Sequence, residues 1–414
     1  MIISQSVAPT TSPTPYRQGI FTVVAFSLGA SLPTSTALMN ITLALVVVCL
    51  LCQRDRQHLG KLVKQPLVWL PALMFTLLAC SLLTQPHDYG PTMVGKYQKL
   101  LYVLPLALFF LADRKLAARF VSGFLWANAL ILFISLATGL EHITLGKLNP
   151  QDPTVFKLHI TQNVFMALAA LVWLTRAHAG TGRQRWGYAA LVVLASANVL
   201  LMVQGRTGYV ALGIGTSVWL LLTLKRQARL WGGCAGLLVL TLLVLIPNRA
   251  FEHMRTGVQE IKQCVTASET QAYQACNTSM GQRTEFIHDA LHPIRQAPWF
   301  GHGAGSFRHV NLYNGQRVNN PHNEYLLETV QNGLLGLVVF LTWMGFCYRA
   351  AWHLPTGRRN VFVAVLSSYM ACHLFNSFLL DSSEGHLFVI IAALLAGFAV
   401  TNPVQQHQPI ASKY

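Results

Sequence analysis

Long apolar runs dominate the chain, and most of them approach the length that a helix needs to cross a membrane. A bilayer core is spanned by about 20 predominantly apolar residues. The runs predict about twelve transmembrane helices, nine before a polar interruption and three after it, and therefore an all-α polytopic membrane protein. Their approximate ranges are 19–32, 35–52, 66–84, 97–112, 117–137, 159–175, 186–204, 207–224, 230–247, 324–348, 359–380 and 386–401.

Basic residues indicate on which side of the membrane each loop lies. More than half of the 30 Lys and Arg residues fall on one side if the N-terminus is cytoplasmic, and the short loops on the other side carry few. Cytoplasmic loops are enriched in Lys and Arg, so both termini are expected in the cytoplasm. The net charge of +16 is then largely a topological signal and does not indicate nucleic-acid binding. A composition of 53% hydrophobic and 11% charged residues excludes an ordinary soluble domain.

The one long polar stretch between the apolar runs, which we call the insertion, comes late in the chain. Its position makes the layout asymmetric, and no internal repeat of the kind found in transporters accompanies it. The expected domains are a disordered cytoplasmic tail at 1–18, transmembrane helices 1–9 at 19–247, the external insertion at 248–322, transmembrane helices 10–12 at 323–402, and a cytoplasmic tail at 403–414.

Two local patterns stand out within the insertion. Residues 280–296 have helical spacing, and Arg283 shares a face with Phe286 and Ile287, which predicts a helix that directs Arg283 into the membrane domain. Cys264 and Cys276 are the only cysteines of the insertion. A disulfide between them is expected in an oxidising compartment, with two free thiols as the alternative.

Ionisable residues cluster where the insertion meets the tenth apolar run. In Pro321–Gly333, His322 precedes a helix whose polar stripe continues through Glu324, Glu328 and Gln331. Charged groups near hydrocarbon are costly and mark functional sites by default. The cluster therefore predicts a site with a partner elsewhere in the chain.

Arginines are the expected partners of this histidine. Arg206 lies in a very short turn between two predicted helices, and Arg283 lies in the insertion, where Arg317 of a second Gly-Gln-Arg triplet is its rival. Guanidinium groups bind phosphate oxygens bidentately and keep their charge, and a histidine can accept the proton of an attacking hydroxyl. The arginines and the histidine together suggest group transfer from a phosphate-linked donor. Arg206 by itself also fits a membrane-surface anchor.

The sequence favours a reaction without metal or other cofactor. The chain has no Asp-x-Asp pair, the motif that usually binds the divalent cation of a sugar nucleotide. Glu285, His288, Asp289 and His292 have usable metal-ligand spacing on one stripe of the predicted loop helix, but a solvated helix face explains them more simply. The glycine-rich segment 298–306 is a weak phosphate-loop signal, because no Walker lysine follows.

Four motifs together resemble the O-antigen ligase and polymerase superfamily of bacterial envelope glycosyltransferases. They are the Gly-Arg-Thr-Gly-Tyr turn at 205–209, Gly-Gln-Arg at 281–283, Trp-Phe-Gly-His-Gly-Ala-Gly-Ser at 299–306 and Pro-His-Asn-Glu-Tyr-Leu at 321–326. The resemblance implies a GT-C-type, metal-independent, inverting enzyme of the bacterial inner membrane. Such a ligase moves O-antigen from undecaprenyl diphosphate to lipid A-core oligosaccharide, and the insertion becomes its periplasmic loop domain.

The resemblance also assigns roles to single residues. Arg206 and Arg283 match the family's diphosphate-binding arginines, and His322 matches its essential histidine. Asn323, Glu324 and Arg317 are further candidates for substrate binding. Glu324 either orients His322 or an acceptor hydroxyl, or caps the following helix.

The expected partners are the lipid-linked O-antigen donor, the lipid A-core acceptor and membrane lipids, without nucleic acid. Basic residues on the external side, among them Lys96, Lys99, Lys147 and Lys157, either meet phosphates or anchor the protein at the interface. A repeat-unit polymerase or a protein O-oligosaccharyltransferase shares the motifs, and a lipid-linked sugar flippase is the non-enzyme alternative. The compact chain and small insertion favour a ligase over a protein O-oligosaccharyltransferase, whereas only the overall family resemblance favours a ligase over a polymerase.

Overall fold

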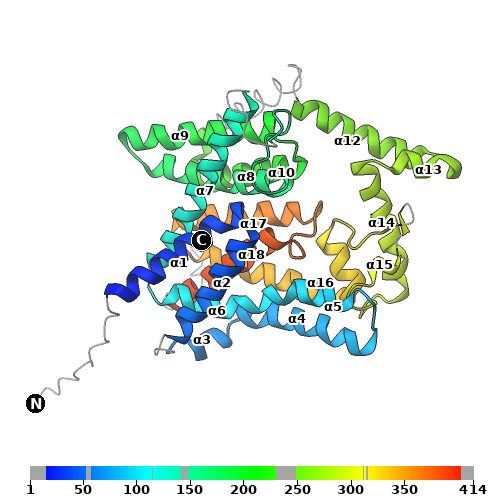
Figure 1. Cartoon of the computed structure of the whole chain (residues 1–414), viewed down its shortest axis with the longest axis horizontal. Coiled ribbons are helices and arrows are strands. Elements are labelled where there is room, and N and C mark those ends of the chain that lie inside the picture. Colours follow the sequence, from blue (N-terminus) through cyan, green and yellow to red (C-terminus); the bar gives the residue numbers. More distant parts are fainter. Residues whose placement is uncertain are drawn as a thin grey trace, which may run out of the picture.

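The computed structural model describes residues 15–52, 57–113, 115–140, 148–229, 249–310, 312–313 and 316–401, and these are almost entirely helical (Figure 1). Within these described ranges, seven helical segments are long and apolar enough to cross a membrane: Pro66–Thr84, Gly90–Leu111, Lys115–Gly139, His159–Ala179, Gly182–Met202, Glu324–Trp352 and Ser382–Thr401. The predicted multi-pass helical protein is thus confirmed. The count of twelve stays a prediction, and the helix expected at 230–247 and most of both tails lie outside the described residues.

The elements follow one another in the order of the predicted apolar runs. Before the insertion come α1 (Pro15–Thr34), α2 (Thr36–Leu51), α3 (Leu59–Val63), α4 (Pro66–Thr84), α5 (Gly90–Tyr97), the 3-10 helix η1 (Gln98–Tyr102), α6 (Val103–Leu111), α7 (Lys115–Gly139), α8 (His159–Ala179), α9 (Gly182–Ala197), the π-helix η2 (Asn198–Met202) and α10 (Arg206–Thr223). The insertion contains α12 (Arg249–Thr266), α13 (Glu269–Cys276), α14 (Ser279–Gln296), α15 (Phe307–Val310) and the antiparallel pair β1 (Leu312–Tyr313) and β2 (Gln316–Arg317). The chain continues with α16 (Glu324–Trp352), α17 (Thr356–Cys372) and α18 (Ser382–Thr401).

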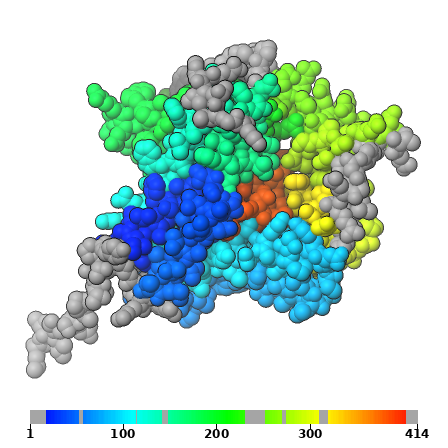
Figure 2. Space-filling model, in the orientation of Figure 1, coloured from blue at the N-terminus to red at the C-terminus, as the bar shows by residue number. Residues whose placement is uncertain are grey.

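Helix α18 lies at the centre of the helical body. Nearly all of its side chains are buried, and it packs against α6, α16 and α4. In Figure 2 the orange and red C-terminal segments show only through a gap between the blue N-terminal helices and the green and yellow parts of the chain. Its all-round apolar character is what a fully enclosed helix requires.

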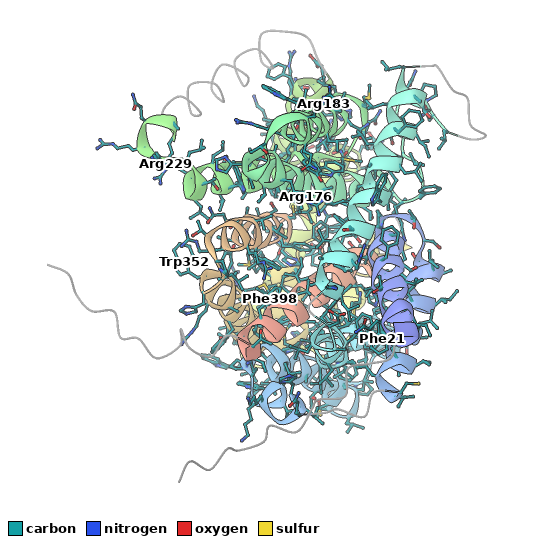
Figure 3. The ribbon with its side chains drawn as sticks, turned by 90° about the vertical axis from the view of Figure 1, so that its left-hand side faces the viewer. Phe21, Arg176, Arg183, Arg229, Trp352 and Phe398 are labelled. Atoms are coloured by element: carbon teal, nitrogen blue, oxygen red, sulfur yellow. A yellow bond between two sulfur atoms is a disulfide. The ribbon has the colours of Figure 1, made fainter. Side chains whose placement is uncertain are left out.

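The insertion and the basic helix ends occupy opposite ends of the molecule. Helices α12 to α15 gather at the right of Figure 1. Figure 3 looks onto the left-hand end, where Arg176, Arg183 and Arg229 lie at the ends of α8, α9 and the segment after α10. The separation agrees with the topology expected from the charges.

The disulfide expected within the insertion is confirmed. Cys264 near the end of α12 is joined to Cys276 at the end of α13. The bridge ties α12 to the residues that immediately precede α14. It therefore fixes the two longest helices of the insertion relative to each other.

The glycine-rich segment 298–306 docks into a break in α16. Gly333 has φ 64° and ψ −166°, which interrupts the helix. Carbonyl groups exposed by the break accept backbone bonds from the segment, from His302 N to Val330 O at 2.8 Å and from Gly303 N to Gln331 O at 2.9 Å. These main-chain N–H groups of the glycine-rich segment thus hold the segment against α16.

Alanine at Gly333 is expected to destabilise the protein by about 1–3 kcal/mol, because this backbone region is essentially restricted to glycine. A Cβ there would also lie 2.3 Å from the carbonyl carbon and oxygen of Trp299. Thermal unfolding of Gly333→Ala in detergent should show a lower midpoint. Gly345→Ala on the same helix is the control, since nothing lies within 4 Å of its added Cβ. Equal midpoints for the two variants would contradict the docking role.

One predicted boundary is wrong. The helix expected at 359–380 ends at Cys372, and residues 373–381 form turns before α18. Apolar residues such as Phe378 and Leu379 continue the hydrophobic pattern through these turns because they are buried. The turns present backbone carbonyls, including that of Phe375, towards the insertion.

Candidate functional site

His322 lies in the short connection before α16, held in an unusual backbone conformation. Its φ of 50° is the one positive value among the described non-glycine residues. The His322 N–H donates to Asn320 Oδ1 at 2.8 Å, and its ring stacks on Phe286 of α14 with centroids 6.1 Å apart. A strained residue fixed from two sides is typical of functional positions.

The surroundings of His322 keep its imidazole neutral. Burial, and then the nearby charge of Arg283, lower the pKa of His322 to about 4. A pKa below the usual 6.5 leaves the ring unprotonated near pH 7. A neutral imidazole beside a cation can accept a proton, and a bound anion would make it a better base.

Arg283 projects from the first turns of α14 towards the membrane helices, as its place on an apolar face predicted. Its Nε donates to Phe375 O at 3.3 Å, and its Nη1 donates to Ser279 O at 3.1 Å and Ser279 Oγ at 2.9 Å. Burial, and then the charge of Arg206, lower the pKa of Arg283, although the guanidinium stays charged at neutral pH. All three of these acceptors are neutral, so the charge of Arg283 is available to an anion.

Arg206 is the first residue of α10, after a turn that α8 fixes. Asn163 of α8 donates to both Val203 O and Gly205 O at 3.1 Å. A cation at a helix N-terminus opposes the helix dipole, so Arg206 needs a compensating anion. Its Nη1 lies 3.3 Å from Glu260 Oε2 on α12.

The three residues thus form a connected electrostatic group at the junction of α10, α14 and α16. The charge of Arg206 acts on Arg283, and the charge of Arg283 acts on His322. Two guanidinium groups beside a neutral imidazole match the requirements of an anionic leaving group and a proton acceptor.

The side chains of Asn323 and Glu324 form hydrogen bonds within α16 and to the segments that pack against it. Asn323 Oδ1 accepts the Leu326 N–H at 3.1 Å as an N-cap, and its Nδ2 donates to Leu374 O at 3.1 Å. Glu324 is fully buried and accepts hydrogen bonds from Tyr97 Oη at 2.6 Å and Leu379 N at 2.9 Å. These contacts tie Glu324 to Tyr97 and to the turns at 373–381. The expected roles of Glu324 towards His322, an acceptor hydroxyl or the helix cap stay predictions.

Among the remaining candidates, the described side chains do not belong to this group. Arg317 pairs through its backbone with Leu312 in the β1–β2 hairpin, and its side chain lies outside the description. His288 has 89% of its side chain exposed, as a solvated helix face requires. Lys99 is buried and donates to Leu380 O and Asp381 O at 3.2 and 2.5 Å, so it does not present its charge to an external phosphate. Lys147 is not among the described residues.

Two contributors to the site were not predicted from the sequence. Glu260 pairs with Arg206 although it lies 54 positions away, and Phe375 supplies an acceptor from within an apolar run. Neither has a local sequence signal, because both contacts depend on how distant segments pack.

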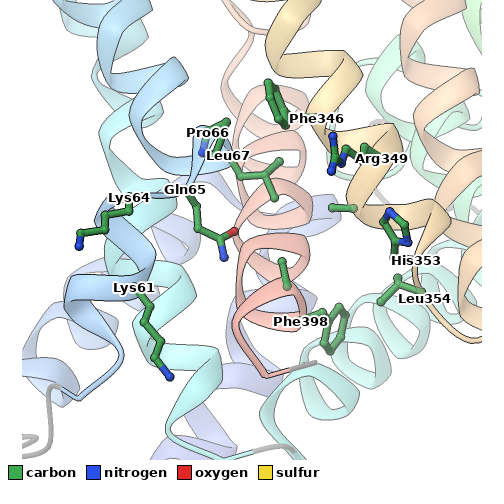
Figure 4. A pocket seen from close by; sticks show the side chains of 12 residues that line it. Lys61, Lys64, Gln65, Pro66, Leu67, Phe346, Arg349, His353, Leu354 and Phe398 are labelled. Carbon is green, nitrogen blue, oxygen red and sulfur yellow. The ribbon is translucent and has the colours of Figure 1, made fainter. Parts of the chain in front are cut away.

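A separate cavity of about 340 Å³ lies at the other end of α16 (Figure 4). Phe346, Arg349 and Leu354 line one side of it, and Lys61 and Lys64 belong to the other. A helix rises 1.5 Å per residue, so Phe346 lies roughly 33 Å along α16 from its first residue. The cavity is therefore distinct from the group around His322.

The segment that contains Arg206, Arg283 and His322 is similar in sequence to known proteins. Residues 189–341 match a family model described as O-Antigen ligase. The chain is 29% identical over 88 residues to an O-antigen ligase of Pseudomonas aeruginosa, which covers 21% of each chain. It is 35% identical over 74 residues to an uncharacterized protein of Haemophilus influenzae, covering 16% of this chain and 18% of that one.

The matched stretches span only about a fifth of the length of these curated relatives. The family match, in contrast, includes Arg206, Arg283 and His322. Over residues 189–341 the chain resembles the O-antigen ligase family, as its motifs predicted.

Proposed function

We propose that the protein is an O-antigen ligase, a membrane glycosyltransferase of the GT-C type. It transfers O-antigen polysaccharide from undecaprenyl diphosphate to lipid A-core oligosaccharide at the periplasmic face of the bacterial inner membrane. The observation that carries the proposal is the group of Arg206, Arg283 and neutral His322 within the family match.

In the proposed reaction His322 acts as the general base. A hydroxyl of the acceptor sugar attacks the anomeric carbon of the donor, and His322 accepts the hydroxyl proton. The new glycosidic bond forms as the bond between the anomeric carbon and the diphosphate oxygen breaks. Attack from the face opposite the leaving group inverts the anomeric configuration in a single displacement.

The two arginines stabilise the leaving group. Negative charge develops on the diphosphate as the glycosidic oxygen departs, and guanidinium groups placed beforehand lower the barrier without rearranging. Guanidinium groups keep their charge at physiological pH. This arrangement supplies the electrostatic stabilisation for which other glycosyltransferases use a divalent cation, so we propose a metal-independent reaction.

The topology of the proposal follows the charge distribution. The helix ends that carry Arg176, Arg183 and Arg229 face the cytoplasm, as basic loops do. Residues 248–322 then form the periplasmic loop domain between membrane segments 19–247 and 323–402, and the tails 1–18 and 403–414 are cytoplasmic. A disulfide in the insertion fits an oxidising compartment.

Deletion of the gene from its host tests the proposal against its alternatives. The ligase predicts lipopolysaccharide reduced to lipid A-core, with lipid-linked polymer accumulating on the periplasmic side, and restoration by the wild-type gene. Lipid A-core capped by a single repeat unit would identify a polymerase. Accumulation of the lipid-linked sugar on the cytoplasmic side would identify a flippase, and normal lipopolysaccharide with unglycosylated envelope proteins would identify a protein O-oligosaccharyltransferase.

A further inference from the structure

One face of α12 covers the guanidinium of Arg206. Arg206 Nε donates to His253 O at 3.1 Å, and Arg206 Nη1 donates to Glu260 Oε2 at 3.3 Å. Gly257 lies between them on the same face, and a Cβ added there would be 3.4 Å from Arg206 Cζ. Spacings of four and three residues align His253, Gly257 and Glu260 on the helix, so α12 approaches Arg206 closely.

The carboxylate of Glu260 occupies an anion position that two elements build. The same oxygen, Oε2, also accepts the Met280 N–H at the start of α14, at 3.0 Å. Free N–H groups at a helix N-terminus favour an anion, and here a guanidinium adds to them. The side chain of Glu260 is largely enclosed, with 15% exposed.

The second arginine shows why this carboxylate is significant. The neutral oxygen acceptors of Arg283 contrast with the charged partner of Arg206. Glu260 also acts on Arg283, since its charge raises the pKa that burial and Arg206 lower. One carboxylate therefore sits within the field of both cations.

We propose that Glu260 holds the place of the donor's diphosphate in the empty enzyme and is exchanged for it when the donor binds. The inference rests on the proposed function, because it takes Arg206 and Arg283 as the diphosphate ligands. A diphosphate joined to a lipid and a sugar carries two negative charges, whereas the carboxylate carries one. The diphosphate gains both guanidinium groups and the Met280 N–H when Glu260 rotates away.

The exchange gives Glu260 a positioning role both before the donor binds and after the glycan is transferred. In the empty enzyme it keeps Arg206 oriented and offsets repulsion between two neighbouring cations. After transfer it competes with the released undecaprenyl diphosphate for the same donors. Glu260 thus assists product release without touching the reacting sugar.

Equilibrium binding of undecaprenyl diphosphate to the full-length protein in phosphatidylcholine nanodiscs tests the exchange. Glu260→Gln keeps an oxygen for the Met280 N–H but removes the competing charge, so its Kd should fall roughly three- to tenfold relative to wild type. Glu252→Gln makes the same charge change at an exposed position in the first turn of α12 and should leave the Kd unchanged. The double variant Arg206→Ala with Glu260→Gln should not show this lower Kd, because it has no Arg206 guanidinium for the substitution of Glu260 to free.

The outcomes separate the exchange from the proposed function. An unchanged or weaker affinity in Glu260→Gln, with Arg206→Ala still weakening binding, overturns the exchange and leaves the diphosphate site intact. Equal tightening by Glu260→Gln and Glu252→Gln also overturns it, since net charge would then be the cause. Failure of wild-type protein to bind undecaprenyl diphosphate contradicts the proposed function itself.

Discussion

Replacing His322 with alanine is expected to lower turnover by roughly two to four orders of magnitude, the usual contribution of a positioned general base. Donor binding should change little, because Arg206 and Arg283 remain in place. His322→Asn is the sharper variant, since asparagine tolerates a positive φ better than most residues and cannot accept the proton as a base. Both variants are to be compared with wild type in glycan transfer by purified protein.

The pH profile distinguishes a base from a structural histidine. The pKa of His322 is lowered to about 4, and the base works only when unprotonated. Wild-type kcat/KM should therefore stay constant from neutral pH to about 5 and fall as the pH drops through 4. The variants should not show this decrease at acidic pH. His288→Ala, at an exposed site on α14, should behave as wild type. Near-normal turnover in both His322 variants would contradict the assignment.

Replacing Arg283 with lysine is expected to lower kcat by roughly two to three orders of magnitude, comparable to the loss of one donor to a developing oxyanion. Lysine keeps the charge but not the planar fork that meets two phosphate oxygens, and its shorter reach loses the contacts to Phe375 and Ser279. Arg283→Ala should lose more, since it also removes the charge.

Arg295→Ala provides the matched control for this series. Arg295 is exposed in the last turn of the same helix, so its removal changes net charge without touching the proposed site. The decisive comparison is kcat measured at saturating donor. Full activity in Arg283→Ala would remove Arg283 from the diphosphate site, and equal losses in Arg283→Ala and Arg295→Ala would point to a nonspecific charge effect.

Much of the fold could be predicted because membrane-spanning helices have a minimum length and composition. The boundaries of α4 and α8 lie close to the apolar runs that predicted them. The turns at 373–381 escaped prediction because they carry buried apolar residues such as Phe378 and Leu379, whereas most loops are polar and exposed. Hydrophobicity alone does not separate a buried turn from a helix.

The site was predictable to the extent that its residues carry local signals. Arg283 could be oriented because a cation on an apolar helix face is exceptional, and the contact with Phe375 agrees. Glu260 had no such signal, since a glutamate on an amphipathic loop helix is ordinary until Arg206 is known to lie against it. Glu324 carried a local signal as a carboxylate at the start of an apolar helix, but nothing in the sequence pointed to its partner Tyr97, which comes from another helix.

We propose that the two arginines and His322 together promote the transfer of a glycan from a lipid diphosphate. Transfer by purified protein from undecaprenyl-diphosphate-linked O-antigen to lipid A-core oligosaccharide, measured in the presence of EDTA, tests this proposal. We expect full activity, release of undecaprenyl diphosphate and an inverted anomeric linkage in the product. Activity that disappears in EDTA and returns with a divalent cation, or a product with retained configuration, would contradict it.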